Sequence, residues 1–242
     1  MKRVVFQGLR GGTGTTSTVA AIGDALQSLD ESVLLIDLAP TNLLSLHFGI
    51  SPQDPRGWAR TSVDGGSWYE TTFEVKPGLH LLPFGLLSEA ERRHVFGSSQ
   101  FLAAAGPKEL AGLTNQYSFI LIDLSSSATA MKSWTAGCDL QIMTAEADPA
   151  SCALLFKLPR DARRRYLITR YDPISRIQRD IRLLWQAQLG SSLLPQVMHR
   201  DASMIEALGY RQAVGSYRPN SLAAQDAMDI AVWCQRHIEA RA

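Results

Sequence analysis

The feature that most restricts the fold of this chain is a glycine-rich loop near its start, between a short apolar segment and a helical pattern. The loop reads Gly8-Leu9-Arg10-Gly11-Gly12-Thr13-Gly14-Thr15-Thr16-Ser17. A strand, a glycine loop and a helix in this order let backbone amides and the helix N-terminus cradle phosphates, because glycine permits close approach. A tight turn without a ligand is the alternative, and the surrounding pattern favours phosphate binding.

The loop lacks the lysine with which an ordinary phosphate-binding loop reaches the β- and γ-phosphates. That motif ends in Gly-Lys-Ser/Thr, whereas Gly14 is followed here by Thr15 and Thr16. The amides and the helix dipole remain, but one charge-assisted contact, worth about 1.5 to 3 kcal/mol, is lost. Arg10 is the one cation left in the loop.

Short apolar runs alternate with longer helical patterns, which predicts an α/β fold with a mostly parallel central sheet flanked by helices. A length of 242 residues suits one domain over residues 1–242. We expect strands at Arg3 to Gly8, Val33 to Asp37, Leu79 to Leu82, Phe119 to Asp123, Leu140 to Thr144, Tyr166 to Thr169 and Leu193 to Val197. We expect helices at Thr15 to Leu29, Ile174 to Leu189, Ala202 to Leu208 and Ser221 to Glu239.

Three further patterns concern how these elements pack. Val33 to Ile36 and Phe119 to Ile122 are apolar on both alternations, which predicts strands at the sheet centre, covered on both faces. Ser51 to Gly78 is rich in proline and glycine and predicts a loop-rich excursion. One face of the last helix is expected to pack on the sheet, formed by Ala223, Ala227, Ile230, Ala231, Cys234 and Ile238.

The bulk composition argues for an ordinary cytoplasmic protein. A formal net charge of +1, with 19% charged residues, gives no reason to expect an obligatory nucleic acid partner. Cys138, Cys152 and Cys234 have neither disulfide-framework nor zinc-site spacing, which suits a reducing compartment. We expect no signal peptide and no transmembrane segment, since no apolar run approaches the roughly 18 residues that a spanning helix needs.

Arg10-Gly11-Gly12-Thr13-Gly14-Thr15-Thr16 resembles the deviant Walker A loop of the MinD/ParA ATPases, Lys-Gly-Gly-Val-Gly-Lys-Thr. Arg10 matches the signature lysine of that family and Thr15 the ordinary one. The resemblance implies a homodimer across ATP, in which Arg10 crosses to the partner's nucleotide; a planar guanidinium suits phosphate oxygens. The alternative is a solvated loop arginine.

The same resemblance implies a magnesium site. Asp123 is similar to the Walker B aspartate that holds Mg²⁺, the Thr16 hydroxyl would be a direct ligand, and Asp37 would lie nearby. An aspartate that caps a turn is the alternative for Asp123. Asp37-Leu38-Ala39-Pro40 resembles the family's Asp-x-Asp-Pro segment, but Ala39 replaces the second aspartate, which weakens the case for hydrolysis.

Two segments are expected to reach the nucleoside. Thr169 and Arg170 occupy the place where the family reads adenine with an asparagine, so that base specificity is implied by the resemblance alone. His199 and Arg200 follow an expected strand and would line the same pocket; a surface turn is the alternative.

The resemblance becomes more specific for the BcsQ branch of the family, the accessory ATPases of bacterial cellulose secretion. It extends over most of the chain through Gly57-Trp58-Ala59-Arg60, Leu82-Pro83-Phe84-Gly85, Leu193-Leu194-Pro195, His199-Arg200-Asp201, Val214-Gly215-Ser216-Tyr217-Arg218 and Leu222-Ala223-Ala224. It implies an ATP-dimerised regulatory protein with slow or absent hydrolysis, a small BcsR-type partner and further cellulose secretion components. Recruitment to the inner membrane would go through those partners.

Other features leave rival functions open. A basic cluster is formed by Lys157, Arg160, Arg163, Arg164 and Arg165. It is either a solvated surface or a patch that contacts DNA, acidic lipid or an acidic partner, and DNA contact would fit a ParA-like, cargo-positioning ATPase. A scaffold that binds no nucleotide is a further alternative. A membrane-surface switch is disfavoured, because no separate amphipathic tail follows the last helix. Trp58 and Trp68 are either partner anchors or satellite core.

Overall fold

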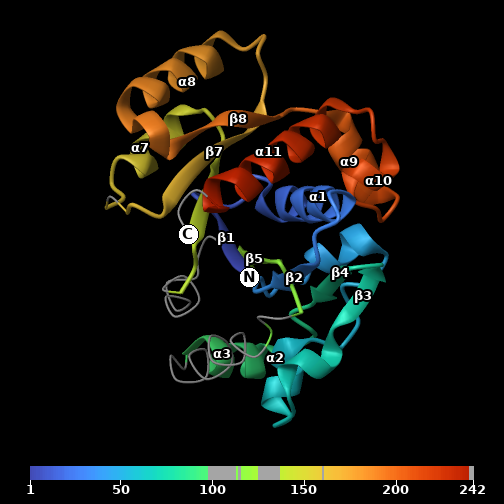
Figure 1. Cartoon of the computed structure of the whole chain (residues 1–242). Coiled ribbons are helices and arrows are strands. Elements are labelled where there is room, and N and C mark those ends of the chain that lie inside the picture. The colour runs from blue at the N-terminus through green and yellow to red at the C-terminus, as the bar shows by residue number, and fades with distance from the viewer. Residues whose placement is uncertain (98–112, 114–115, 125–136, 160, 240–242) are drawn as a thin grey trace.

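An eight-stranded sheet forms the centre of the computed structural model, which describes residues 1–97, 113, 116–124, 137–159 and 161–239 (Figure 1). The strand order is β3-β4-β2-β5-β1-β6-β7-β8, and all neighbours run parallel except β3 and β4. The strands are β1 (Lys2–Gly8), β2 (Val33–Asp37), β3 (Phe73–Lys76), β4 (Leu79–Leu82), β5 (Phe119–Leu124), β6 (Leu140–Ala145), β7 (Arg164–Tyr171) and β8 (Leu193–His199).

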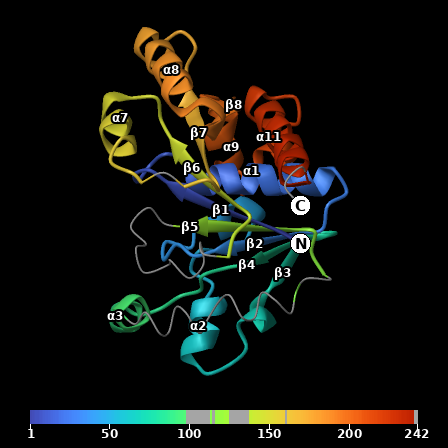
Figure 2. The same cartoon turned by 60° about the vertical axis from the view of Figure 1, so that its left-hand side comes forward.

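Helices cover both faces of this sheet. They are α1 (Thr15–Ser28), α2 (Trp58–Val63), α3 (Glu89–Gly97), α7 (Pro149–Leu155), α8 (Arg176–Leu189), α9 (Ala202–Gly209), α10 (Val214–Tyr217) and α11 (Leu222–Glu239). Figure 2 shows α1 and α11 together on one side, with α2 and α3 on the other. The predicted mostly parallel, helix-flanked α/β sheet is confirmed. No helix among the described residues is both long and apolar enough to cross a membrane.

Alternation along the central strands divides the core into two layers. Val33 and Leu35 of β2 pack beneath α1 and α11, whereas Leu34 and Ile36 pack with Trp58 on the opposite face. Every residue of β2 and of β5 is buried, as expected for strands covered on both sides. On that opposite face a separate cluster lies under α7 and α8, around Trp185.

Two expectations about local structure have clear outcomes. The predicted apolar face of α11 is confirmed: Ala223, Ala227, Ile230, Ala231, Cys234 and Ile238 are all buried in the cluster beneath α1. The expected loop-rich excursion of residues 51–78 also contains α2 and β3, which the sequence did not predict. β3 pairs antiparallel at the sheet edge and is only partly buried, so it lacks the apolar run that marks the central strands.

The Gly57-Trp58 segment is part of the core. The Trp58 amide donates to the Pro83 carbonyl at 3.0 Å, and its indole Nε1 donates to the Asp37 carbonyl at 2.8 Å. Trp58 is completely buried, so it is core and not an exposed partner anchor. The indole hydrogen bond to Asp37 connects α2 to the end of β2. Gly57 lies against the main chain of Gly85.

Replacing Gly57 with alanine should destabilise the fold. A Cβ at this position would lie 2.5 Å from the Phe84 carbonyl carbon and 2.6 Å from the Gly85 Cα, and the backbone cannot yield as a flexible side chain would. We expect the free energy of unfolding to fall by about 1 to 3 kcal/mol in urea denaturation. Gly209→Ala, where the added methyl meets open space, is the matched control and should change stability by less than about 0.5 kcal/mol. Equal effects of the two substitutions would contradict this account of the packing.

Candidate nucleotide site

The glycine loop between β1 and α1 encloses a cavity instead of collapsing onto itself. Gly12 and Gly14 adopt left-handed backbone angles, with φ of 83° and 75°. The cavity has a volume of about 340 Å³ and is lined by Gly8, the loop residues Arg10 to Ser17, Ala39, Thr41, Leu43, Asp123 and Leu124. Helix α1 starts at Thr15 without a side-chain cap, and its first residues Thr15, Thr16 and Ser17 line the cavity. The first amides of a helix have no partner within it, so this end of α1 suits an anion.

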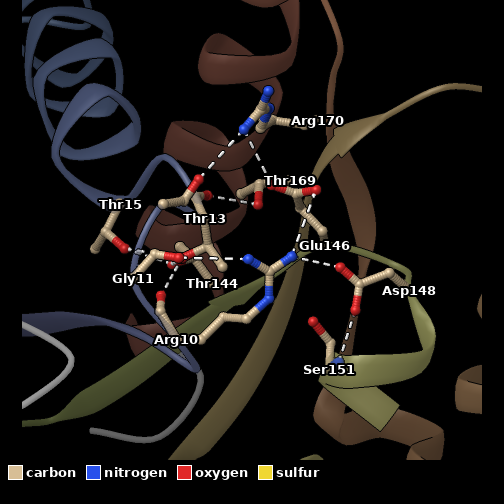
Figure 3. A network of polar contacts seen from close by, with 11 residues as sticks. Arg10, Gly11, Thr13, Thr15, Thr144, Glu146, Asp148, Ser151, Thr169 and Arg170 are labelled. Carbon is tan, nitrogen blue, oxygen red and sulfur yellow. Dashed lines mark hydrogen bonds and ion pairs between the residues drawn. The ribbon is translucent and has the colours of Figure 1, made fainter.

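Hydrogen bonds to two neighbouring strands hold the loop in this shape (Figure 3). The Thr13 and Thr15 hydroxyls lie 3.1 and 2.7 Å from the hydroxyl of Thr144, at the end of β6. The Thr169 hydroxyl of β7 donates to the Thr13 carbonyl at 2.7 Å. The Leu9 amide donates to the Thr144 carbonyl at 2.9 Å. The loop is therefore tied to β6 and β7 through threonine hydroxyls on both sides and through the Leu9 amide.

Arg10 is held within its own chain by two carboxylates. Its guanidinium donates to Asp148 and lies 3.7 Å from the Glu146 carboxylate, while Nη1 donates to the Gly11 carbonyl at 3.4 Å. Its side chain is 33% exposed, so Arg10 is not the freely solvated arginine that the sequence left as an alternative. Asp148 in turn caps α7 by accepting from the Ser151 amide at 2.7 Å. The arginine thus connects the loop to the start of α7.

Glu146 joins a second cation to this network. The Arg170 guanidinium lies 3.1 Å from the Glu146 carboxylate and donates to the Gly12 carbonyl at 3.4 Å. Arg10 and Arg170 therefore share one acidic residue beside the loop, as Figure 3 shows. A multiply charged anion in the cavity would compete with Glu146 and Asp148 for these guanidinium groups.

Two buried aspartates lie side by side below the loop. Asp37 and Asp123 are register neighbours at the ends of β2 and β5. Burial, and then the charge of Asp123, raise the pKa of Asp37 well above its ordinary value. Burial raises the pKa of Asp123 to about 6, partly offset by a hydrogen bond from Thr16. Two carboxylates in so dry a position favour either a retained proton or a bound cation.

The donor set suits magnesium through Asp123 and Thr16. Asp123 lines the cavity, and its Oδ2 is buried without a hydrogen-bond partner among the described residues. Asp37 is outside the lining, and its two oxygens accept from the Ala39 amide at 2.8 Å and the Leu44 amide at 3.1 Å. An orphaned carboxylate oxygen beside a hydroxyl is a fitting pair of oxygen ligands for Mg²⁺. The expected part of Asp37 in holding the metal stays a prediction, and here it orders the following loop.

A second hollow shares part of its wall with the cavity under the loop. It has a volume of about 290 Å³, and both hollows are lined by Gly12, Gly14 and Ser17. The structure brings the four residues predicted to reach the nucleoside together in its wall, namely Thr169, Arg170, His199 and Arg200. The apolar part of the wall comes from Met198, Met204, Ile205 and Leu208.

Two polar side chains of this wall, His199 and Asp201, have protein partners that the sequence does not reveal. His199 Nδ1 lies 2.9 Å from an oxygen of Asp226 on α11, which also accepts from the His199 amide. Asp201 caps α9 through the Ser203 amide and accepts from the Ala223 amide at 3.0 Å. The wall of the second hollow therefore comes from the loop, α1, β7, β8 and α9, and two of its side chains are held from α11.

A family model described as cellulose biosynthesis protein BcsQ matches residues 1–235 of the chain. The chain belongs to the BcsQ family. One relative is the cellulose biosynthesis protein BcsQ of Salmonella typhimurium (strain LT2), 37% identical over 235 residues that cover 96% of this chain and 93% of the relative. The BcsQ of Escherichia coli K12 is 37% identical, with 95% and 92% covered.

Solved structures place the BcsQ fold among MinD and ParA proteins. A ParA family ATPase from Chlorobium tepidum has a TM-score of 0.76 at 20% identity, covering 96% of this chain and 98% of the other. The septum site-determining protein MinD from Pyrococcus horikoshii, complexed with Mg-ADP, has a TM-score of 0.72 at 20% identity, with 96% and 95% covered. The resemblance drawn from the sequence and the P-loop fold class are both confirmed.

The basic cluster of this BcsQ-family chain is not an uninterrupted cationic surface. Arg165 is buried, and its guanidinium donates to the Ala162 carbonyl at 2.9 Å. Arg164 donates to the Pro159 carbonyl at 2.7 Å, and Arg163 lies 3.7 Å from the Asp161 carboxylate. Arg160, of the same cluster, lies outside the described residues. The contacts of the other three arginines of the cluster give no support to a DNA-binding patch.

The pKa of Asp123 generates a test in the nucleotide-free and metal-free chain. Because burial raises this pKa from 3.8 to about 6, the stabilising contribution of Asp123 is present below pH 3.8 and is lost as the pH rises through about 6. The side chain of Asp123→Asn stays neutral at every pH. At pH 8 its free energy of unfolding should therefore exceed that of the wild type by up to about 3 kcal/mol, seen as a higher midpoint in urea. The two proteins should converge near pH 4.

The matched control is Asp229→Asn, which removes the same charge from an exposed position of α11. It should show no such pH-dependent gain. Urea unfolding in a metal chelator at pH 4, 6 and 8 makes the comparison. A stability difference between Asp123→Asn and wild type that is constant over this range would contradict the assigned burial effect.

Proposed function

We propose that this BcsQ-family protein binds ATP with Mg²⁺ at the loop of Arg10 to Ser17, and that two copies close on the nucleotide. Its role would be that of an accessory, regulatory switch in bacterial cellulose synthesis and secretion. The observation that carries the proposal is the open cavity beneath the start of α1, with Asp123 and Thr16 in its wall. MinD of Pyrococcus horikoshii, which has the same fold, is described as a complex with Mg-ADP.

The contiguity of the two hollows supports a nucleotide as the ligand. The phosphates would occupy the cavity under the amides of α1, and the nucleoside would extend over Gly12 and Gly14 into the second hollow. When bound, Mg²⁺ would supply positive charge beside the phosphate oxygens, and the Thr16 hydroxyl and Asp123 carboxylate would hold it. Below about pH 6, deprotonation of Asp123 would accompany metal binding.

Depleted catalytic groups support slow or absent hydrolysis. Thr15 replaces the lysine that would stabilise charge on the β- and γ-phosphates. Ala39 contributes a methyl group to the cavity wall at the place where the related motif carries an aspartate. Among the described residues that line the cavity, Asp123 is the one carboxylate. A site of this kind holds a triphosphate longer than it turns one over, which suits a switch.

The proposed dimer requires Arg10 to change partners. In the free chain its guanidinium is engaged by Asp148, and reaching a second copy's nucleotide means leaving that carboxylate. The phosphate groups offer a planar guanidinium at least as many acceptors as Asp148 does, so the exchange loses no charge-assisted bond. Nucleotide and partner copy together would supply the free energy for this exchange.

Family membership supports the biological setting. Relatives at 37% identity are named cellulose biosynthesis proteins. We infer that a small BcsR-type accessory protein and further secretion components are its partners, and that any recruitment to the inner membrane goes through them. A ParA-like role in DNA positioning is not favoured, because the three arginines of the basic cluster that the structure describes are engaged by main-chain carbonyls and Asp161.

Molar mass with and without nucleotide tests the proposal. Light scattering on the wild type should give a monomer alone and a dimer with ATP and Mg²⁺, whereas Arg10→Ala should stay monomeric or dimerise at least tenfold more weakly. Arg10→Lys keeps the charge but loses the planar fork, so it should lie between the two. Calorimetry on the same samples should detect ATP binding by all three proteins.

Two outcomes would refute the proposal. One is a wild-type chain that neither binds ATP nor changes its mass. The other is an Arg10→Ala variant that dimerises on ATP as strongly as the wild type.

A further inference from the structure

A buried hydroxyl network lies directly behind the loop of Arg10 to Ser17, the proposed phosphate loop. Thr144, at the carboxyl end of β6, is completely buried. Its hydroxyl lies 2.7 Å from that of Thr15 and 3.1 Å from that of Thr13. The Thr13 hydroxyl donates to the Arg10 carbonyl at 3.2 Å. Three threonines thus connect the middle of the sheet to the main chain of the loop.

Proton accounting gives this network a direction. A carbonyl oxygen only accepts, so Thr13 must spend its single hydroxyl proton on the Arg10 carbonyl. Two protons then remain for three hydroxyl contacts, which are Thr15 to Thr144 at 2.7 Å, Thr144 to Thr13 at 3.1 Å and Thr15 to Thr13 at 3.3 Å. Thr144 donating to Thr13 and Thr15 donating to Thr144 is the one arrangement that satisfies the two shorter contacts, and it leaves the longest one without a proton. The hydroxyl proton of Thr15 therefore points into the protein, away from the cavity.

We propose that Thr144 is a positioning residue that keeps the phosphate loop open, and that Thr15 serves this network and does not donate to the phosphates. Thr15 stands where an ordinary loop has its lysine, so the position has exchanged a ligand contact for a structural one. The inference rests on the proposed nucleotide site. The ligand class is a nucleoside triphosphate, gripped by the main-chain amides that the network arranges.

Preorganisation is the physical reason for the exchange. A glycine-rich loop has many conformations, and ordering it on binding would reduce affinity. The Thr144 hydroxyl restrains the loop at Thr13 and Thr15. The Thr144 carbonyl also accepts a hydrogen bond from the Leu9 amide at 2.9 Å. Thr169 adds a restraint from β7, at the Thr13 carbonyl. The amides are therefore already ordered when the triphosphate arrives.

Calorimetry with Mg²⁺ and a non-hydrolysable ATP analogue tests the role of Thr144. Thr144→Val keeps the side-chain shape but removes the hydroxyl, and it should weaken binding about five- to tenfold, the equivalent of one or two lost hydrogen bonds. Thr144→Ser restores the hydroxyl and should bind within about twofold of the wild type. Equal binding by the valine variant and the wild type, or no rescue by serine, would overturn the proposal.

A double-mutant cycle tests the direction of the network. If Thr15 donates inward to Thr144, then Thr15→Val and Thr144→Val remove the same interaction, and the double variant should bind no more than about twofold more weakly than either single variant. If Thr15 instead donates to the phosphates, the two losses should multiply. Multiplicative losses would overturn the assignment of Thr15.

Amide hydrogen exchange without nucleotide separates this inference from the proposed function. In Thr144→Val the amides of residues 9–17 should exchange at least about fivefold faster than in the wild type, and in Thr144→Ser they should not. A wild type that binds no nucleotide would refute the proposed function, while the exchange comparison would still decide whether Thr144 orders the loop. Unchanged exchange in the valine variant would overturn the positioning role.

Discussion

Everything proposed for this molecule depends on the hydrogen bonds that tie the phosphate loop to the strands beside β1. The sheet order places β6 next to β1 and β7 next to β6, so that Thr144 and Thr169 end beneath the loop. Both hydroxyls are buried, and leaving a buried hydroxyl without its hydrogen-bond partner costs about 1 to 3 kcal/mol. This cost keeps the loop attached to the strands. A loop held in this way keeps its amides directed at the cavity without a lysine.

Electrostatics then explains why the site suits a magnesium–triphosphate complex. Asp37 and Asp123 are buried side by side, where two negative charges would repel each other. One oxygen of Asp123, beside Thr16, has no hydrogen-bond partner among the described residues. On the other side of the loop, Arg10 and Arg170 are neutralised by Glu146 and Asp148. The site thus offers a cation position on one flank and exchangeable guanidinium groups on the other. A ligand that carries both a metal ion and several phosphates matches both flanks.

The local signals in the sequence were sufficient for the central architecture but not for the partners across the sheet. Fully apolar runs located β2 and β5, and the glycine loop located the cavity. The sequence does not reveal the edge strand β3, because this strand is half-exposed. It does not reveal α7 because that helix has only 7 residues, although its start, an aspartate cap at Asp148 followed by Pro149, is a recognisable signal. The engagement of Arg10 by Asp148 spans 138 residues of sequence, and the network through Thr144 spans 131, so only the fold itself could reveal them.

Backbone amide shifts test the central claim, that main-chain groups of residues 11–16 grip a triphosphate without a lysine, more directly than any activity. In ¹H–¹⁵N spectra of the labelled chain, ATP with Mg²⁺ should produce its largest downfield shifts at the amides of residues 11–16, and adenosine should not. Shifts confined to other residues, or an equal response to ATP and adenosine, would contradict the account.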